Sequence, residues 1–282
     1  MIPATFDYES PRTLGEALAL LAARGEEAKL LAGGHSLLPA MKLRLAQPPA
    51  LIDLGRIPGL AYIREAHERI SLGAMTTHAA VADSDLLHSG CPLLAETAAA
   101  IGDVQVRNRG TLGGSLAHAD PAADYPAAIL ALDAELVTIS EKGERVIKAR
   151  DFFTGMFTTA LRPDEILIEV RVPKTGAAGT AYKKFHHPAS GFAVVGVAAV
   201  VRIKAGRIES ASVGITGVAE RAYRATAVEQ ALRGQASIAD AAAHAADGVE
   251  ALGDHFASSE YRAHLAAVFT RRALEEARAR AR

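Results

Sequence analysis

The chain contains one cysteine, Cys91, among its 282 residues. A single thiol cannot form an internal disulfide, and it cannot by itself hold an iron–sulfur cluster, which needs several thiolate ligands. The scarcity of cysteine is typical of proteins from reducing compartments, so we expect an intracellular protein. Any iron–sulfur centre that works with this chain must lie on another chain.

Features of nucleic-acid-binding and membrane proteins are also missing. The 31 basic and 32 acidic residues give a net charge of −1, which argues against general nucleic-acid binding. The longest strongly apolar run, near residues 192–201, is far shorter than the roughly 20 residues that a spanning helix needs. Residues 1–10 lack the basic region and apolar stretch of a signal peptide. We expect a soluble cytoplasmic protein that reaches the inner face of a membrane only through partners.

Familiar nucleotide-binding and catalytic motifs are absent as well. The sequence has no G-x-G-x-x-G, no glycine loop ending in G-K-S or G-K-T, and no G-x-S-x-G. These absences argue against a Rossmann site, a P-loop and a serine nucleophile on a sharp turn. His118, Asp120 and Asp124 match no common metal-ligand spacing. We therefore expect no metal site, no catalytic nucleophile and no acid–base pair in this chain.

Two glycine pairs are the most informative features that the sequence does have. The first lies in Ala32-Gly33-Gly34-His35-Ser36, and the second in Thr111-Leu112-Gly113-Gly114-Ser115. Glycine reaches positive φ angles and allows close approach of a ligand, and consecutive N–H groups in such a turn can bind an anion. Two such turns could hold the two phosphates of one dinucleotide, although each pair taken alone is more often an ordinary turn. Ser36 would then donate its hydroxyl to a phosphate.

The second glycine pair belongs to a polar stretch, residues 102–126, that is rich in turn-forming residues and shows no helical period. We expect little regular structure there. Irregular backbone beside a core is costly unless its polar groups find partners, and a polar cofactor is one way to supply them. Asp124, near an expected helix start, indicates a cap or a hydrogen-bond acceptor for the ribityl or ribose hydroxyls of a nucleotide.

Hydrophobic periodicity predicts both helices and strands along the chain. Thr13 and Glu16 form a predicted capping box for the first helix. Turn signals at residues 57–59 and the segment 173–179 divide the chain into residues 1–57, 58–175 and 176–282. The expected helices are residues 14–21, 76–82, 92–101, 121–132, 222–233, 238–252 and 258–282. The expected strands are residues 29–32, 70–74, 134–140, 166–172, 180–185, 192–204 and 208–216, the last two joined by a hairpin turn at 205–206.

The sequence resembles the FAD-binding medium subunits of the molybdenum hydroxylases, the xanthine dehydrogenase and carbon monoxide dehydrogenase group, and most of all the carbon monoxide dehydrogenase type. The resemblance covers the whole chain. It begins with Met1-Ile2-Pro3 and Phe6-Asp7-Tyr8, and includes AGGHSLLPAMKLRLAQP (32–48), IDLGRIPGL (52–60), LGAMTTHAAVADS (72–84) and QVRNRGTLGGSLAHADPAADYP (105–126). It implies the α+β fold class, with a two-subdomain FAD-binding fold (PCMH-type), residues 1–57 and 58–175, followed by a C-terminal domain of a small antiparallel sheet plus helices.

The resemblance also implies which residues bind FAD. Residues Ala32 to Ser36 would contact the diphosphate, with residues Thr111 to Ser115 on the other side. Asp124 would bind the ribityl chain, and Leu167 would offer a backbone contact. Lys184 would lie near the pyrimidine edge of the flavin.

Two positions of the resemblance carry open questions. Phe192 stands where close relatives have a tyrosine beside the isoalloxazine, and the missing hydroxyl would change the flavin potential or access to it. His35 is either a residue that modulates the flavin or phosphate region or a solvated structural histidine.

In this family the activity is shared among three subunits. The substrate is oxidised at a molybdenum cofactor on a large subunit, and two [2Fe–2S] clusters on a small subunit pass the electrons to FAD on the chain that this one resembles. An external acceptor, either a quinone, NAD or oxygen, then takes them, and the implied assembly is a dimer of heterotrimers. The substrate stays open among carbon monoxide, a purine, an aldehyde and an N-heterocycle.

Two other functions remain as alternatives. A stand-alone flavin oxidoreductase would oxidise its own small substrate without partner subunits. An interaction or assembly subunit would have lost the flavin, and the intact glycine pairs argue against that alternative.

Overall fold

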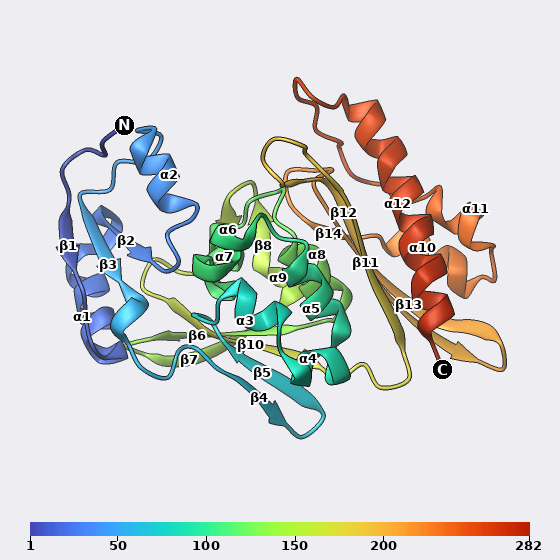
Figure 1. Cartoon of the computed structure of the whole chain (residues 1–282), viewed down its shortest axis with the longest axis horizontal. Coiled ribbons are helices and arrows are strands. Elements are labelled where there is room, and N and C mark those ends of the chain that lie inside the picture. The colour runs from blue at the N-terminus through green and yellow to red at the C-terminus, as the bar shows by residue number, and fades with distance from the viewer.

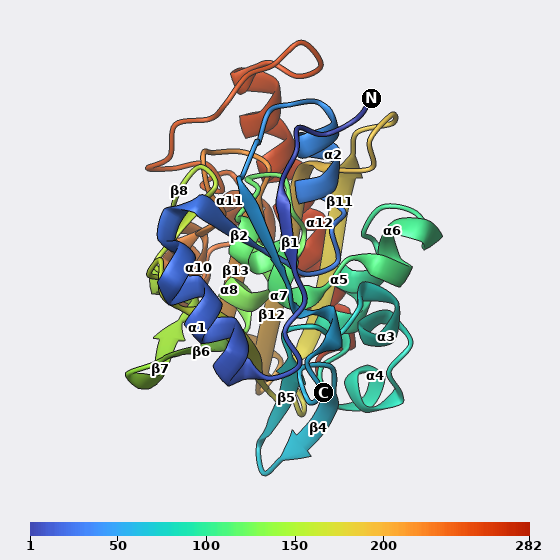
Figure 2. The ribbon, with the colours of Figure 1, turned by 90° about the vertical axis from the view of Figure 1, so that its left-hand side faces the viewer.

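The computed structural model describes residues 1–282 as three units that lie side by side along the long axis of the molecule (Figure 1). The first unit has a small parallel sheet in the order β1-β3-β2. Figure 2, in which this unit faces the viewer, shows one helix beside the lower part of the strands and one at their upper end. Its elements are β1 (Asp7–Glu9), α1 (Leu14–Arg24), a 3-10 turn (Gly25–Glu27), β2 (Ala28–Leu31), α2 (Leu37–Lys42), β3 (Ala50–Asp53) and a second 3-10 turn (Leu54–Arg56).

Helix α1 begins where the sequence predicts. The Thr13 hydroxyl accepts a hydrogen bond from the Glu16 N–H at 3.1 Å, which confirms the cap. The Glu16 carboxylate accepts a hydrogen bond from the Arg12 N–H at 2.8 Å and not from the Thr13 N–H. The second bond of the predicted capping box is therefore made to the residue before Thr13. Leu18 and Leu21 then share the buried face of the helix, in one core with strand β3.

The second unit is an antiparallel sheet in the order β4-β5-β10-β6-β7, with its helices gathered on one face (Figure 1). Alternation along β5 turns Ile70 and Leu72 into the largest core of the chain, while Arg69 and Ser71 lie on the outer face. The strands of this sheet are β4 (Ile63–Ala66), β5 (Arg69–Gly73), β6 (Glu135–Ser140), β7 (Gly143–Lys148) and β10 (Ile166–Pro173). A separate two-stranded sheet is formed by β8 (Phe153–Gly155) and β9 (Thr158–Thr159). The helices of the second unit are α3 (His78–Ala82), α4 (Asp85–Gly90), α5 (Pro92–Ala99), α6 (Val104–Arg109), α7 (Leu112–His118), α8 (Tyr125–Ala131) and α9 (Ala149–Phe152).

The third unit is an antiparallel sheet in the order β11-β12-β13-β14, packed between α12 on one face and α8 of the second unit on the other. Val195 and Val197 of β12 join the core beneath α12, whereas Ala198 joins the core that contains α8. The sheet is therefore buried on both faces, which explains its nearly continuous apolar sequence. Its elements are β11 (Gly179–His186), β12 (Ala193–Lys204), β13 (Arg207–Thr216), β14 (Tyr223–Arg224), α10 (Thr226–Arg233), α11 (Ile238–Ala242) and α12 (Ser259–Arg280).

The predicted hairpin turn at Ala205 and Gly206 is confirmed. Both residues have positive φ angles, 50° and 75°, as a two-residue turn between twisted strands requires. None of the helices combines the length and the apolar composition needed to cross a membrane.

The expectation of little regular structure over residues 102–126 was wrong, because α6 and α7 lie there. Each of these short helices is capped by a side chain: Asp103 accepts from the Val106 N–H at 2.8 Å, and Thr111 accepts from the Gly114 N–H at 3.1 Å. Leu112 and Leu116, one helical turn apart, anchor α7 in the core.

Other boundaries differ from the expectation. The helix expected from residue 121 begins only at Tyr125, because Asp120 accepts from the Ala122 N–H at 2.8 Å and forms a turn there. The helix expected over 238–252 ends at Ala242 and gives way to turns. Strands β1, β4 and β7 and helices α2 and α4 are short elements that the periodicity did not indicate.

Candidate functional site

The two glycine pairs meet at the junction between the first and second units. A side chain on Gly33 would overlap the carbonyl oxygen of Arg109 and would place its Cβ 2.7 Å from the Cα of Gly110. An added Cβ on Gly114 would lie 3.2 Å from the Cβ of Ala32. The fold thus brings together two motifs that are far apart in the sequence, as binding of one dinucleotide by both would require.

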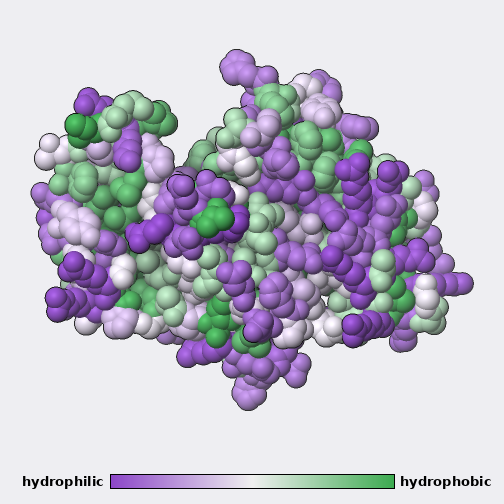
Figure 3. All heavy atoms as spheres, in the orientation of Figure 1, coloured by the Kyte–Doolittle hydropathy of each residue, from purple (hydrophilic) through white to green (hydrophobic).

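The surface is hollowed beside this junction. Figure 3 shows the hollow between the lobe formed by the first unit and the rest of the molecule. In the same orientation, α2 borders the hollow on one side, and the connection between β11 and β12 borders it on the other (Figure 1).

The first glycine turn presents unused hydrogen-bond donors. The N–H groups of Gly33, Gly34, His35, Ser36 and Leu37 donate to no other group of the chain, although all but His35 are partly buried. Gly34 has a φ angle of 76°, which favours glycine. The Ser36 side chain occupies the N-cap position of α2 without capping it. A turn with several N–H groups that have no partner in the chain can bind an acceptor such as a phosphate.

The second glycine pair does not form the predicted anion-binding turn. Gly113 and Gly114 lie in the first turn of α7, and their N–H groups already donate to the Ala74 carbonyl at 2.8 Å and to the Thr111 hydroxyl at 3.1 Å. An added Cβ on Gly113 would lie 2.5 Å from the Cβ of Ala74. The pair therefore permits close packing of α7 against the neighbouring segments.

Asp124 and Lys184 form a buried ion pair. The ammonium lies 2.9 Å from the carboxylate, and the two side chains are 6% and 5% exposed. Lys184 also donates to the Ala100 carbonyl at 2.9 Å, and the Tyr182 hydroxyl donates to Asp124 at 2.5 Å. Burial raises the pKa of the Asp124 carboxyl, and the Lys184 charge and the Tyr182 hydrogen bond oppose that rise. A carboxylate offers about four acceptor positions, so Asp124 can still accept from a ligand hydroxyl.

The remaining predicted residues have different surroundings. Leu167 pairs with Thr138 along β10 and β6 and turns its side chain into the core. Phe192 ends the loop between β11 and β12, and its side chain is exposed. The preceding glycine of this loop, Gly191, packs near the segment before α6. His35 is exposed, and its Nδ1 lies 3.2 Å from the Gly33 carbonyl oxygen.

Three residues near these positions were not singled out by the sequence. His78 and Tyr125 are buried with ring centroids 5.2 Å apart, and neither the His78 Nδ1 nor the Tyr125 hydroxyl has a partner. Burial, with smaller contributions from His35 and Arg107, lowers the pKa of His78 to about 4, so this imidazole is neutral at pH 7. Tyr182 could have been found from the sequence, because alternation along the expected strand puts it on the same face as Lys184.

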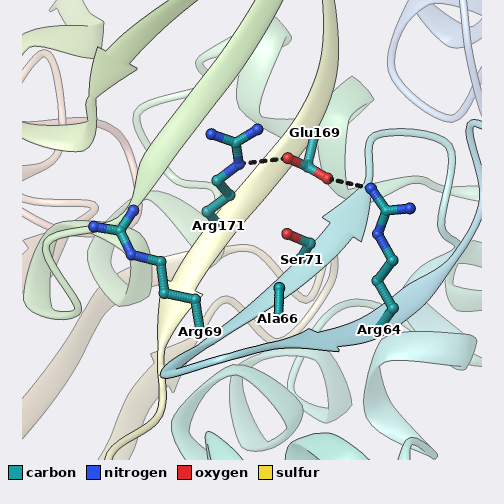
Figure 4. Close-up of a pocket in the computed structure, with 6 residues that line it drawn as sticks. All are labelled: Arg64, Ala66, Arg69, Ser71, Glu169 and Arg171. Atoms are coloured by element: carbon teal, nitrogen blue, oxygen red, sulfur yellow. Dashed lines mark hydrogen bonds and ion pairs between the residues drawn. The ribbon is translucent and has the colours of Figure 1, made fainter.

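A second concavity lies on the outer face of the five-stranded sheet and is lined by none of the predicted residues (Figure 4). Glu169 lies between Arg64 and Arg171, at 3.3 Å and 2.5 Å. Arg69 of β5 pairs with Glu135 of β6 across the intervening strand β10. Because every guanidinium there already has a carboxylate partner, these ion pairs explain the arrangement without a ligand.

Comparisons with known proteins agree with the geometry. The family described as the FAD binding domain in molybdopterin dehydrogenase matches residues 4–175, and the CO dehydrogenase flavoprotein C-terminal domain matches residues 180–277. The α+β fold class expected from the sequence is confirmed.

Similar proteins cover the chain from end to end. It is 41% identical over 285 residues to the carbon monoxide dehydrogenase medium chain of Hydrogenophaga pseudoflava, covering 99% of each chain. It is 37% identical to the 6-hydroxypseudooxynicotine dehydrogenase complex subunit alpha of Paenarthrobacter nicotinovorans, covering 100% of this chain and 97% of that one. A solved carbon monoxide dehydrogenase from Hydrogenophaga pseudoflava, which lacks the Mo-pyranopterin moiety of its cofactor, superimposes with a TM-score of 0.97 at 42% identity over 100% of both chains. The chain therefore belongs to the FAD-binding medium chains of the carbon monoxide dehydrogenase-like molybdenum hydroxylases, and it is an oxidoreductase subunit.

Proposed function

We propose that this chain is the electron-transfer subunit of a molybdenum hydroxylase complex, binding FAD in the hollow between its first and second units. The observation that carries the proposal is the row of unused N–H donors over residues 33–37, placed directly against the second glycine motif. Two phosphates need many donors, and oriented backbone N–H groups recognise them without a basic side chain.

We assign the diphosphate to Ala32 through Ser36. Gly114 packs against Ala32 of that turn, Thr111, Leu112 and Gly113 fix the position of α7, and Ser115 adds its hydroxyl. This assignment gives the two glycine motifs different tasks. Their geometry supports it, since the donors of the first turn are unused and those of the second are not.

The rest of the proposed FAD site lies on the second and third units. Asp124 accepts from the ribityl hydroxyls, Leu167 supplies a backbone contact, and Lys184 holds a positive charge near the pyrimidine edge. Phe192 lies beside the isoalloxazine and, having no hydroxyl, offers it an apolar contact only. FAD, when bound, supplies a carrier that exchanges electrons singly or in pairs.

We further propose a large molybdenum-cofactor subunit and a small subunit with two [2Fe–2S] clusters as partners, in a dimer of heterotrimers. The single thiol supports this division of labour, because a cluster needs several thiolate ligands and the chain has only the buried Cys91. The acceptor for the electrons is a quinone, NAD or oxygen. We place the complex in the cytoplasm, held at a membrane only through partners.

The division into residues 1–57, 58–175 and 176–282 remains our proposal for the domains. The three larger of the four sheets, one in each segment, and the three hydrophobic clusters support it. Relatives of similar identity serve complexes named for carbon monoxide, glyceraldehyde and caffeine. We therefore propose that this chain performs the same electron transfer whichever substrate its large subunit oxidises.

A visible absorption spectrum of the purified chain, before and after addition of FAD, tests the proposal. We expect a flavin spectrum, FAD in the supernatant after acid release, and no oxidation of small donors by the chain alone. If the isolated chain binds no flavin, the same measurement on the assembled complex shows whether the site forms only with the partner subunits.

Two outcomes would favour the alternatives. Oxidation of a donor by the purified chain would support a stand-alone flavin oxidoreductase. Absence of flavin from the complete complex would support a flavin-free assembly subunit and would refute the proposal.

A further inference from the structure

The third unit holds the segment that leads into Asp124. The carbonyl groups of residues 121–123 accept hydrogen bonds of 2.7–3.2 Å from the Thr216 hydroxyl and from the N–H groups of Gly217 and Ala193. These donors come from the ends of β12 and β13, so two strands of the third unit fix the backbone just before the carboxylate.

Tyr182 of β11 fixes the carboxylate itself. Its hydroxyl donates to one oxygen of Asp124 at 2.5 Å, while the Lys184 ammonium binds the carboxylate at 2.9 Å. The Lys184 ammonium lies 2.9 Å from both oxygens of Asp124 and does not distinguish them, whereas the Tyr182 hydroxyl holds one of the two. The terminal torsion of an aspartate is broad, so Tyr182 adds the contact that fixes which oxygen faces the third unit. Both donors lie on the face of β11 that meets the second unit.

The sheet makes room for this tyrosine. A Cβ on Gly196 of the neighbouring strand would overlap the Tyr182 hydroxyl oxygen. A side chain on Gly214 would overlap the carbonyl oxygen of Ala127 in α8, so glycine also brings the sheet close to that helix. The hydroxyl is therefore confined, with Asp124 as its partner.

We propose that Tyr182 is a positioning residue for the FAD site: through its hydrogen bond it holds the Asp124 carboxylate in the orientation that accepts from the ribityl chain. Thr216 supports the same orientation through the backbone of residues 121–123. The third unit thereby contributes to FAD affinity through a residue that touches Asp124. This inference rests on the proposed function, because it requires that Asp124 contacts FAD.

The test uses the assembled complex, from which FAD is removed and titrated back. We expect Tyr182→Phe to raise the Kd for FAD about tenfold, because a hydrogen bond to a charged group is lost and the carboxylate can turn. We also expect a changed visible circular dichroism of the bound flavin, because this signal depends on how the flavin is held.

Tyr223→Phe is the matched control. The Tyr223 hydroxyl also donates one partly buried hydrogen bond in the third unit, to the Ala245 carbonyl at 2.9 Å, but it does not contact Asp124. We expect this variant to lose similar stability while keeping the wild-type Kd and flavin dichroism. Equal Kd values and spectra for Tyr182→Phe and Tyr223→Phe would overturn the inference.

A second variant covers the case in which Tyr182→Phe does not assemble. Thr216→Val removes the hydroxyl that holds the carbonyls of Pro121 and Ala123, and we expect a several-fold rise in the Kd for FAD. An unchanged Kd and dichroism for this variant would equally overturn the inference. Failure of the wild-type complex to bind FAD would instead refute the proposed function.

Discussion

The two glycine pairs have the same composition and different structures. Gly33 and Gly34 lie in an open turn after β2, with a positive φ angle at Gly34 and N–H groups that have no partner. Gly113 and Gly114 lie in the first turn of a helix, with ordinary φ angles and N–H groups that are already bonded.

The difference shows that a glycine pair in a sequence indicates close approach of another group to the backbone, but not whether that group is a ligand or another part of the protein. At the second pair the neighbour is the protein itself, namely Ala74 and Ala32. At the first pair, Gly33 meets the backbone of Arg109 and Gly110, and the adjoining N–H groups are left for a ligand. Four measurements separate these roles.

The largest effect is expected at Gly33, where both roles coincide. Gly33→Val places a side chain into the Arg109 carbonyl oxygen and pushes the first unit away from the second. We expect a loss of about 3 kcal/mol in the free energy of unfolding, together with loss of bound FAD. Denaturant unfolding and the flavin content of the purified protein measure the two effects.

Gly15→Ala in α1 is the control for this variant. No atom lies within 4 Å of the Cβ that would be added there, so we expect a gain of about 0.5–1 kcal/mol and full flavin content. Wild-type stability in Gly33→Val would show that the two units are not in contact at this point.

A smaller effect confined to binding is expected at Ser36. Its hydroxyl caps no helix and has no partner, so Ser36→Ala should leave the free energy of unfolding unchanged. If the hydroxyl donates to a phosphate, its loss costs about 1.5–3 kcal/mol of binding, or roughly ten- to a hundredfold in the Kd for FAD. Titration of FAD into the stripped protein measures this value, and an unchanged Kd would remove Ser36 from the site.

The third measurement concerns the stability of the protein in acid. It depends on His78, which packs against Gly110, the residue that precedes the second glycine motif. Its folded pKa of about 4 lies below the usual 6.5, so between these values the unfolded chain binds more protons and stability falls as the pH falls. From pH 7 to pH 5 this one histidine should cost about 2 kcal/mol.

Urea unfolding at both pH values tests the assignment of this loss to His78. His78→Gln should reduce the loss by about 2 kcal/mol, because the amide does not titrate in this range. His88→Gln, at an exposed position on α4, should follow the wild type. Identical pH dependence in all three proteins would contradict a buried neutral imidazole.

The open turn was predictable because its signals are local. Gly34 and Ser36 are small residues directly after an apolar strand, and that pattern is enough to predict a turn that exposes donors. The helical second pair was not predicted, because turn-forming residues mask α7. The spacing of Leu112 and Leu116 was its one helical signal, and their burial in the core outweighs local propensity.

The meeting of the two motifs could not be derived from the sequence without a resemblance, since it depends on long-range packing around Gly33 and Gly114. Tyr182 is an intermediate case. Its strand was predicted, and alternation alone places it beside Lys184, but its contact with Asp124 depends on how α8 packs on the sheet. Local pattern therefore predicts which residues share a face, and tertiary packing decides what that face meets.

The smallest effect should come from Thr111, the counterpart of Ser36 in the second motif. Thr111 accepts from the Gly114 N–H and caps α7, so Thr111→Ala should cost about 1 kcal/mol in the free energy of unfolding. The Gly114 N–H then loses its acceptor, and FAD affinity should change far less than in Ser36→Ala. We expect Thr111→Ala to lose stability and keep its affinity for FAD, and Ser36→Ala to lose affinity and keep its stability. That result would establish that the second glycine motif stabilises the fold and that the first binds FAD. Equal affinity losses in the two variants would show that both motifs contact the phosphates directly.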